Sequence, residues 1–216
     1  MIQFEQVSKR YPGGFDALSQ INFKLEKGEM VFLTGHSGAG KTTLLKLIAK
    51  LQSPSSGQLI VNGIHLNQLK RREIAPYRSQ LGIIFQSPNL LYDRSVFDNV
   101  ALPMQIKGFS QTRIFKRVHA ALDMVGLLNK AKIIPAQLSA GEQQRVGIAR
   151  AIVHKPALVL ADEPTGNLDP SLSMGIMTLF QQFNQVGVSV LIATHDLALI
   201  AGIKHRIVML KGGRLC

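Results

Sequence analysis

Residues 35–42 read Gly35-His36-Ser37-Gly38-Ala39-Gly40-Lys41-Thr42, and they directly follow the apolar stretch Met30–Thr34. The spacing matches the phosphate-loop pattern G-x-x-x-x-G-K-[ST], in which a strand leads through a glycine-rich turn into a helix. Glycines let backbone N–H groups curl around a phosphate, and the helix N-terminus adds its partial positive charge. We expect Lys41 to reach the β- and γ-phosphates and the Thr42 hydroxyl to ligate Mg²⁺. The residues expected to contact the nucleotide here are Gly35, His36, Ser37, Gly38, Ala39, Gly40, Lys41, Thr42 and Thr43.

A second polar cluster closes another apolar stretch, Ala157–Ala161, which ends in Asp162 and Glu163. Two carboxylates at the end of a buried strand are costly unless a cation or water balances them. We expect Asp162 to hold Mg²⁺ and Glu163 to orient and deprotonate an attacking water as a general base. The alternatives are a solvated strand end here and an ordinary glycine-rich turn at residues 35–42. Together the two motifs indicate binding of a nucleoside triphosphate.

The composition sets the protein class. The 216 residues are 46% hydrophobic and 18% charged, which excludes a chain that is disordered throughout. The single cysteine, Cys216, excludes an intramolecular disulfide and a Cys-rich metal site, and it favours a reducing compartment. The N-terminal residues lack the pattern of a signal peptide, and no apolar run approaches the ~20 residues of a spanning helix. We therefore expect one cytoplasmic domain, residues 1–216.

The chain is strongly basic, with a formal net charge of +12 and a pI near 10.1. A basic protein favours an anionic partner such as nucleic acid, an anionic membrane surface or nucleotide phosphates. The charges are scattered, with local density only at residues 70–72 and 113–117. Because no zinc, helix-turn-helix or RNP-type pattern accompanies them, we expect no nucleic-acid partner and a basic face near the inner-membrane surface.

Apolar strand patterns alternate with helical ones along most of the chain. Strands are expected at Ile2–Val7, Leu18–Leu25, Met30–Thr34, Leu59–Val61, Leu81–Phe85, Ala157–Ala161, Val188–Ala193 and Arg206–Leu210. Helices are expected at Lys41–Lys50, Ser95–Lys107, Gln111–Val125, Gly141–His154 and Ser171–Val186. Three strands lead into a polar motif and then a helix, which predicts an α/β fold with its site at the carboxyl ends of the strands. Residues 87–155 are expected to form an inserted helical subdomain, and residues 1–86 and 156–216 the nucleotide-binding core.

Kinases, GTPases and other ATPases share the phosphate loop, so other residues must decide the class. The segment Asn129-Lys130-Ala131-Lys132 lacks the Asp of a guanine-reading Asn-Lys-x-Asp motif. The segment Leu138-Ser139-Ala140-Gly141-Glu142-Gln143-Gln144-Arg145-Val146 resembles the signature motif of ABC-type ATPases. Ser139 and Glu142 also have the spacing of a capping box, so the same residues predict a helix start. The family usually has Gly where this chain has Ala140, and Ala adopts a positive φ less readily.

The resemblance covers essentially the whole chain and implies a P-loop NTPase fold of the ABC ATPase type. This fold has a mixed sheet core, N-terminal antiparallel strands and an inserted α-helical subdomain. The resemblance implies that Gln86 contacts Mg²⁺ or water, that His195 contacts the γ-phosphate, and that Tyr11 stacks on adenine. Alternatively, Gln86 is merely solvated at a strand end and Tyr11 packs beside a Gly-Gly turn. Asn167-Leu168-Asp169 is similar to the D-loop of the family.

Members of this family bind ATP between two nucleotide-binding subunits that face each other head to tail. The resemblance therefore implies a homodimer with ATP, which hydrolysis would open. Residues acting on the ATP of their own chain would be Lys41, Thr42, Gln86, Asp162, Glu163 and His195. Residues acting on the ATP of the other copy would be Ser139 and Gly141.

The stretches Leu33–Lys41 and Asp93–Val100 resemble the bacterial cell-division branch of the family. This resemblance implies an integral membrane subunit on a separate chain, similar to FtsX, and control of septal peptidoglycan hydrolases by ATP cycling. It places the chain at the cytoplasmic face of the bacterial inner membrane, at the division septum, where other division proteins are further partners. The alternative is the ATPase of a lipoprotein-releasing or macrolide-export transporter.

A coupling helix of such a membrane subunit is expected between the Gln86 loop and the helix that follows it. Leu90, Leu91, Tyr92 and Val96 either line this groove or fill the core of the helical subdomain. Two rival classes are an ABC-type DNA-maintenance ATPase and a regulator that binds nucleotide without needing turnover. The first class inserts long coiled coils or zinc modules, whereas about 120 residues without heptads or Cys pairs separate Lys41 from Asp162.

Overall fold

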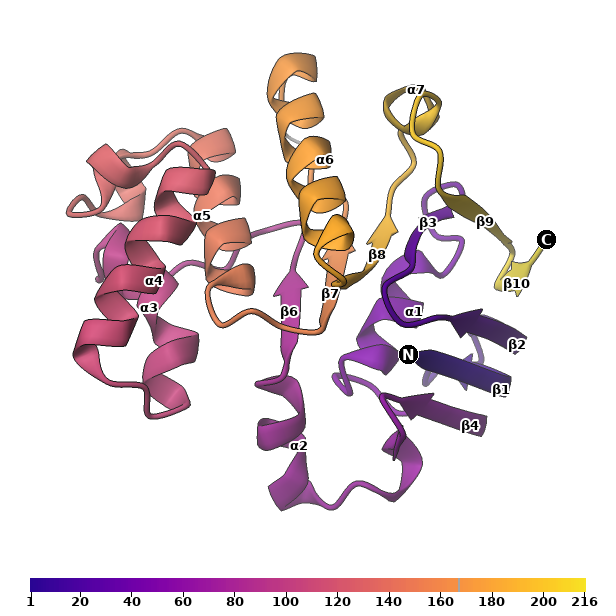
Figure 1. Ribbon diagram of the computed structural model, residues 1–216. Helices are drawn as coiled ribbons and strands as arrows, with labels where there is room; N and C mark the ends of the chain where they lie inside the picture. Colours follow the sequence, from indigo (N-terminus) through magenta and orange to yellow (C-terminus); the bar gives the residue numbers. More distant parts are fainter. Residues whose placement is uncertain (167) are drawn as a thin grey trace.

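The computed structural model describes residues 1–166 and 168–216, and two sheets organise them (Figure 1). The larger sheet has six strands in the order β10-β9-β3-β8-β7-β6, of which β10 is antiparallel to β9 and the others are parallel. Its strands are β3 (Met30–Thr34), β6 (Leu81–Ile84), β7 (Leu158–Asp162), β8 (Ser189–Ala193), β9 (Arg206–Lys211) and β10 (Arg214–Leu215).

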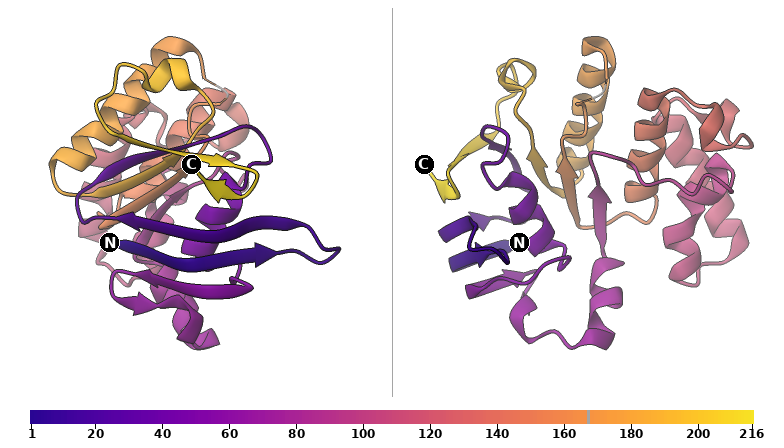
Figure 2. Two further views of the ribbon diagram at one scale, coloured as in Figure 1. Left: turned by 90° about the vertical axis from the view of Figure 1, so that its right-hand side faces the viewer. Right: turned by 180° about the vertical axis from the view of Figure 1, so that it is seen from behind.

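A second, antiparallel sheet with the order β2-β1-β4-β5 forms a separate layer (Figure 2). Its strands are β1 (Ile2–Arg10), β2 (Asp16–Leu25), β4 (Ser56–Val61) and β5 (Ile64–His65). Helix α1 (Lys41–Ile48) lies between the two sheets, and its Leu44 and Leu47 belong to the core that both sheets share (Figure 1). The start of α1, which follows the glycine-rich loop, is therefore held from both sides.

Larger helices lie on the other side of the parallel sheet (Figure 1). Two of them, α5 (Ala140–Ile152) and α6 (Pro170–Gln185), pack against its strands, whereas α3 (Val96–Ile106) and α4 (Gln111–Met124) pack against α5. Because side chains alternate along a strand, Phe32 and Val190 face these helices, whereas Val31 and Leu191 face α1 and the antiparallel sheet. Residues 85–157, all of which the structure describes, contain helices and no strand.

The predicted α/β fold with antiparallel strands and helical insertion is confirmed, and all eight predicted strands and five predicted helices are present with ends shifted by a few residues. Helix α2 (Arg71–Arg78) and the short helix α7 (Leu197–Ile200) were not predicted. The eight residues of α2 are mostly charged or polar, Pro76 lies inside the helix and Tyr77 is its one buried residue, so the segment offers few apolar positions from which to predict a helix. Contacts with α1 hold α2 in place, because the Tyr77 hydroxyl donates to the Ile48 carbonyl. The division into a core and a subdomain of residues 87–155 stays a prediction.

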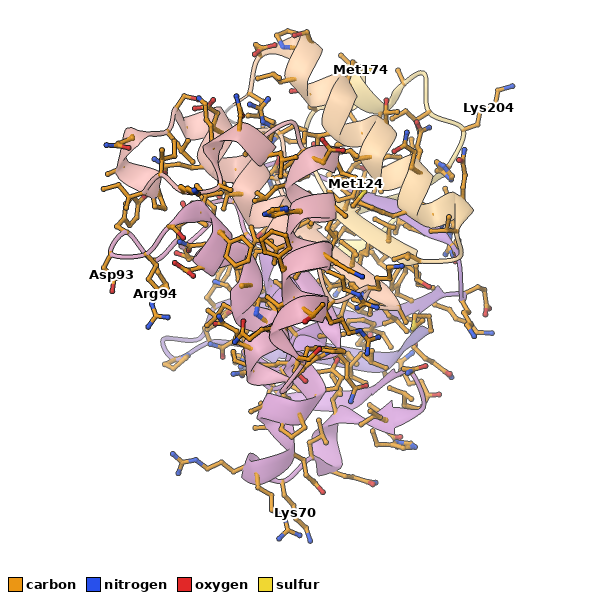
Figure 3. All side chains as sticks on the ribbon, turned by 60° about the vertical axis from the view of Figure 1, so that its left-hand side comes forward. Lys70, Asp93, Arg94, Met124, Met174 and Lys204 are labelled. Atoms are coloured by element: carbon orange, nitrogen blue, oxygen red, sulfur yellow. The ribbon has the colours of Figure 1, made fainter. Side chains whose placement is uncertain are left out.

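The surface carries scattered positive charge. Lys70, Arg94 and Lys204 extend into solvent from different parts of the molecule (Figure 3). Within residues 1–166 and 168–216, no helix combines the length and the apolar character needed to cross a membrane.

Candidate nucleotide-binding site

The strand order β3-β8-β7-β6 places the carboxyl ends of four parallel strands side by side. The phosphate loop follows β3, His195 follows β8, Asp162 ends β7 directly before Glu163, and Gln86 follows β6. Motifs that are distant in sequence thus meet at one edge of the sheet, the usual place for a ligand in this type of fold. A pocket of about 440 Å³ lies at this edge. It is lined by Phe15, Ala17, His36, Ser37, Gly38, Ala39, Gly40, Lys41, Thr42, Thr43, Gln86, Glu163 and His195.

The phosphate loop requires glycine at both of its ends. Gly35 has φ +147°, and a Cβ there would lie 2.2 Å from the carbonyl oxygen of Leu210. Gly40 has φ +109° and precedes α1 without a side chain that could cap the helix. The first-turn amides of α1, at Lys41, Thr42 and Thr43, therefore remain free to bind an anion.

The Lys41 ammonium lies against the loop that precedes it. Its Nζ donates to the carbonyl of Gly35 at 2.6 Å and to that of His36 at 3.3 Å, and it lies 3.6 Å from Oε1 of Glu163. The side chain is only 7% exposed. Since a buried ammonium needs partners, these oxygens hold the charge at the pocket, where phosphate oxygens would provide stronger ones.

Glu163 has a strained backbone. Its φ is +47°, a conformation that residues other than glycine rarely adopt and that is often found at functional sites. The amide of Glu163 donates to the carbonyl of Ala193 at 2.9 Å, which ties this turn to the end of β8. Its carboxylate lies 2.8 Å from Nδ1 of His195, which is 67% exposed. The bend at residue 163 therefore places a carboxylate between the Lys41 ammonium and the His195 ring.

Asp162 is a buried carboxylate with an unmet hydrogen bond. The residue is 9% exposed, and its Oδ1 has no hydrogen-bond partner among the described residues. Burial raises the pKa of Asp162 and the neighbouring Glu163 adds to this rise, while the Thr42 hydroxyl and the Lys41 ammonium oppose it. Asp162 and Thr42 line the same small cavity beside the phosphate loop.

This donor set suits Mg²⁺, which binds one or two carboxylates together with substrate phosphates and water. A buried oxygen without a partner, beside a hydroxyl, offers a hard cation two oxygen ligands. The described residues contain no cluster of three or more His, Cys, Asp or Glu side chains placed to hold a metal by themselves. The residues thus fit a cation that arrives with the nucleotide.

The signature segment begins α5, as predicted. Ser139 Oγ accepts from the Glu142 amide at 3.3 Å, and the Glu142 carboxylate accepts from the Ser139 amide at 3.0 Å, so the predicted capping box is confirmed. Ala140 is the first residue of α5 and is not among the described residues with positive φ, so alanine adopts this backbone without strain. Ser139 and Gly141 do not line the 440 Å³ pocket of their own chain.

Tyr11 lies beside the phosphate loop without lining the pocket. Its hydroxyl is 3.5 Å from that of Thr43, and the Lys9 ammonium lies 5.1 Å from the centre of its ring. The aromatic side chain that lines the pocket is Phe15, which is 61% exposed and which no motif predicted. Its only sequence signal is its position directly before β2.

The D-loop prediction falls partly on Asn167, which lies outside the described residues. Asp169 is described, and it caps α6 by accepting from the amides of Ser171 and Leu172, both at 3.0 Å. The only role that these contacts show for Asp169 is to start α6.

The four residues proposed for a coupling groove divide into two pairs. Leu90 and Val96 are 6% and 0% exposed and belong to the core, so the core interpretation is right for them. Leu91 and Tyr92 are 37% and 54% exposed. Only this second pair is accessible to a partner.

Side chains of α5 hold the loop that contains Gln86. Gln144 donates to the carbonyl of Phe85 at 3.2 Å, and Arg150 donates to the carbonyls of Pro88 and Asn89. The Tyr92 hydroxyl donates to the side chain of Gln143 at 3.0 Å. Hydrogen bonds therefore connect α5, which begins with the signature segment, to the loop that contains Gln86. No sequence motif predicted this connection.

Comparison with known protein families matches residues 18–166 to a family described as ABC transporter. The chain belongs to the ABC transporter family. This ABC-type chain is 58% identical over 215 residues to the cell division ATP-binding protein FtsE of Escherichia coli (strain K12), an alignment that covers 100% of the chain and 97% of the relative. The protein of the same description from Mycobacterium tuberculosis is 44% identical over 216 residues, covering 100% and 94%.

A solved structure has the same fold as this ABC-type chain. It is described as the dimeric, post-hydrolysis state of the ATP-binding cassette MJ0796 bound to ADP and Pi. It matches with a TM-score of 0.93 and 36% identity, covering 100% of this chain and 96% of that one. The predicted family, fold class and enzyme class, an ABC-type ATPase, are thereby confirmed. The roles of individual site residues stay predictions.

Proposed function

We propose that this chain is the ATP-hydrolysing subunit of an ABC-type membrane complex that acts in cell division. The observation that carries the proposal is the arrangement at the sheet edge. Glu163 lies between Lys41 and His195, and it directly follows Asp162, whose Oδ1 has no partner in residues 1–166 and 168–216. A phosphate-binding loop, a metal-binding carboxylate and a general base next to it are the parts that hydrolysis of a nucleoside triphosphate requires.

In the proposed reaction, the loop amides and Lys41 bind the β- and γ-phosphates. Thr42, Asp162 and Gln86 would hold Mg²⁺, which would neutralise developing charge on the phosphate oxygens. Glu163 orients the attacking water and takes its proton. His195, bonded to the Glu163 carboxylate, keeps it aimed at the water and reaches the γ-phosphate from the exposed side.

The site of one chain is incomplete in this proposal. Ser139 and Gly141, at the amino end of α5, would bind the γ-phosphate held by a second copy, since helix N-termini favour anions. The MJ0796 cassette described as a dimer with ADP and Pi supports this assembly. ATP would shift the population toward the closed homodimer, and hydrolysis would release it.

The cell-division role rests on the 58% identity to the E. coli protein described as FtsE. It implies an FtsX-like integral membrane subunit at the cytoplasmic face of the inner membrane, and ATP-driven control of septal peptidoglycan hydrolases. The exposed Leu91 and Tyr92 are the residues proposed to receive the coupling helix, and Tyr92 is hydrogen-bonded to Gln143 of α5.

The decisive experiment identifies the membrane subunit. Tagged chain carrying Glu163→Gln is isolated with ATP and Mg²⁺ from detergent-solubilised membranes, and the co-purifying spanning protein is identified by mass spectrometry. Leu91→Arg should reduce the yield of this protein, whereas Phe115→Ala, also at an exposed side chain, should not. An FtsX-like protein supports the proposal. A subunit of a lipoprotein-releasing or macrolide-export transporter supports the alternative function.

A further inference from the structure

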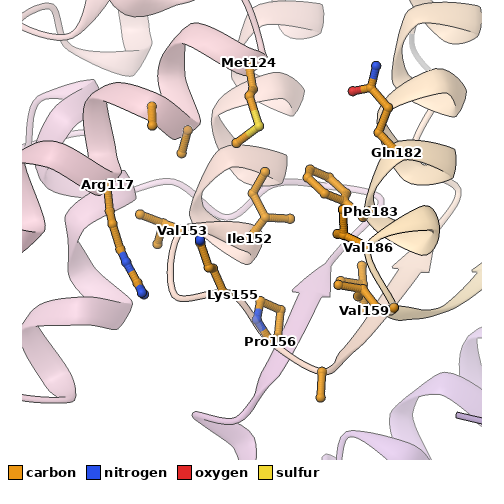
Figure 4. Close-up of a pocket in the computed structure, with 15 residues that line it drawn as sticks. Arg117, Met124, Ile152, Val153, Lys155, Pro156, Val159, Gln182, Phe183 and Val186 are labelled. Atoms are coloured by element: carbon orange, nitrogen blue, oxygen red, sulfur yellow. The ribbon is translucent and has the colours of Figure 1, made fainter. Parts of the chain in front are cut away.

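A second cavity, larger than the nucleotide pocket, lies between α4, the end of α5 and the end of α6 (Figure 4). Its volume is about 730 Å³, and none of its lining residues lines the nucleotide pocket. Because Ala157 and Val188 directly precede β7 and β8, this groove lies at the amino-terminal edge of the sheet, opposite to the nucleotide. It is lined by Arg117, Ala120, Ala121, Met124, Ile152, Val153, Lys155, Pro156, Ala157, Val159, Gln182, Phe183, Val186, Gly187 and Val188.

The walls of the groove are apolar except at three side chains. Arg117 and Lys155 lie on the same side of the groove in Figure 4, and Gln182 lies on α6 across from them. No carboxylate lines the groove, and neither cation takes part in an ion pair among the described residues. The Arg117 guanidinium lies 5.6 Å from the centre of the Phe109 ring, a contact that leaves its charge uncompensated. Both cations can therefore pair with an anion from outside.

Two helix ends modify this charge. α5 and α6 both end at the groove, and each C-terminus carries a partial charge of about −0.5. Arg117 and Lys155 together exceed the charge of these two ends, so the groove stays positive. Lys155 follows the end of α5 with φ +54°, and its amide donates to the Ile152 carbonyl at 2.8 Å. Glycine or asparagine would be less strained here, yet the chain has a long cationic side chain at this position.

We propose that this groove binds a small amphipathic anion, a single unbranched apolar chain that ends in one carboxylate. Its volume lies in the usual range of small-molecule sites, roughly 300–1,000 Å³. The apolar chain would cover Phe183, Ile152 and Met124, and the carboxylate would pair with Arg117 and Lys155. An extended peptide fits less well, because Gln182 is the one uncharged polar side chain in the walls and buried peptide groups need hydrogen-bond partners.

A bound chain would touch both the helical segment, through α4 and α5, and the parallel-sheet layer, through α6 and β7. We expect it to hold these parts at a fixed separation and so to alter ATP turnover. This consequence depends on the proposed function, whereas binding itself does not. The binding experiment is therefore independent of any ATPase measurement.

The chain has no tryptophan, which allows a specific reporter. Val186 lies at the rim and is 78% exposed, so Val186→Trp adds a single indole beside the groove. Laurate, kept below its micelle concentration, should change the fluorescence saturably with one site per chain. Isothermal titration of laurate into the unmodified chain should give the same stoichiometry. Dodecanol, which lacks the charge, should bind at least 10-fold more weakly.

Matched variants separate this site from unspecific adsorption. Arg117→Gln with Lys155→Gln should weaken laurate binding at least 10-fold, whereas Lys204→Gln, at a cation outside the groove, should leave it unchanged. Ala120→Phe should fill the groove and abolish binding while the thermal unfolding temperature stays within a few degrees. The proposal is overturned by non-saturable binding, by equal binding of dodecanol, by charge variants that bind as the parent does, or by tighter binding of an acidic apolar peptide.

Discussion

The two halves of the proposed composite site differ in how well their polar groups are satisfied. At the phosphate loop, Glu163 is strained, Asp162 Oδ1 has no hydrogen-bond partner in the described part of the chain, and Lys41 donates to loop carbonyls. At the start of α5, Ser139 and Glu142 satisfy each other in a capping box. A strained backbone at Glu163 directly beside an unpartnered oxygen at Asp162 is the pattern expected of a site that awaits a ligand. The cap that starts α5 is satisfied within its own chain, and its proposed role depends on a second copy.

The largest effect is expected at the strained residue. Glu163→Gln removes the general base but keeps the shape of the side chain, so turnover should fall ~10²–10⁴-fold while ATP affinity is kept. Steady-state phosphate release and nucleotide titration measure the two quantities. With ATP and Mg²⁺, the variant should elute as a dimer in size-exclusion chromatography with light scattering. A monomer under these conditions would falsify the composite site.

Lys41→Ala removes the charge that the loop holds against the phosphates. Because charge-assisted hydrogen bonds contribute about 1.5–3 kcal/mol, ATP affinity should fall roughly 10–100-fold. Equilibrium titration of the isolated chain measures this effect. Lys70→Ala, at an exposed cation outside the nucleotide pocket, is the control and should bind as the parent does. An unchanged affinity of Lys41→Ala would show that the ammonium does not meet the nucleotide.

Ser139→Arg tests the relaxed half. Turnover should fall at least tenfold, because a bulky cation replaces the hydroxyl that faces the partner's ATP, while ATP affinity of the monomer is unchanged. Loss of the helix cap alone would cost ~1 kcal/mol of stability. Ser139→Asp keeps a cap but removes the hydroxyl, so it separates the loss of turnover from this loss of stability. Mixing the Ser139→Arg and Lys41→Ala chains should restore part of the activity, because one intact composite site forms. No recovery on mixing would contradict the assignment of Ser139 to the partner's ATP.

Arg150 connects the two halves, since it holds the Gln86 loop from α5. Arg150→Met should lower kcat about 2–10-fold with little change in KM, because only part of the roughly 1.5–3 kcal/mol that hydrogen bonds from a charged group contribute is lost in the position of the loop. Arg150→Lys should restore part of the rate. Equal losses in kcat/KM for both variants, matched by equal losses of stability, would indicate a structural role only.

The last prediction concerns stability against pH and leaves the nucleotide site untouched. His154, at 8% exposure, has its pKa lowered to about 4 by burial, and the nearby charge of Lys107 adds to the shift. The unfolded chain therefore binds a proton between pH 6.5 and about 4 that the folded chain does not, so stability falls as the pH drops through this window. At ~1.4 kcal/mol per pKa unit, the free energy of unfolding should fall by about 3 kcal/mol over this pH window.

Urea unfolding at pH 7, 5 and 4 measures this loss. His154→Gln should flatten the pH dependence, whereas His65→Gln, at an exposed side chain, should not. An identical slope for the His154→Gln variant and the parent would assign the effect to other groups.

The site was largely predictable because its residues lie in short local motifs. Three local patterns each have a characteristic residue spacing: the glycine loop before Lys41, the strand that ends at Asp162 and Glu163, and the capping box at Ser139. The antiparallel and parallel strands were predictable from apolar runs bounded by turn residues.

Other features depend on contacts between distant segments. Phe15 reaches the pocket only because β2 packs beside the phosphate loop, and α2 is held by the Tyr77 hydroxyl rather than by an apolar stripe. The hydrogen bond from Arg150 to the Asn89 carbonyl joins residues that are 61 positions apart, and no local sequence pattern predicts such a pair. The groove at Arg117 and Lys155 likewise forms only when α4, α5 and α6 come together.

The carbonyl of Leu210, in β9, occupies the space that a side chain at position 35 would need. The Gly213 amide donates to the Ala39 carbonyl at 3.2 Å, and the Gly213 carbonyl accepts from the Ser19 amide at 2.8 Å. The last two strands thus brace the phosphate loop from behind. In protein engineering, a purification tag or fluorescent protein fused after β10 can disturb these contacts. The nucleotide affinity of such a fusion should therefore be compared with that of a fusion at the amino end.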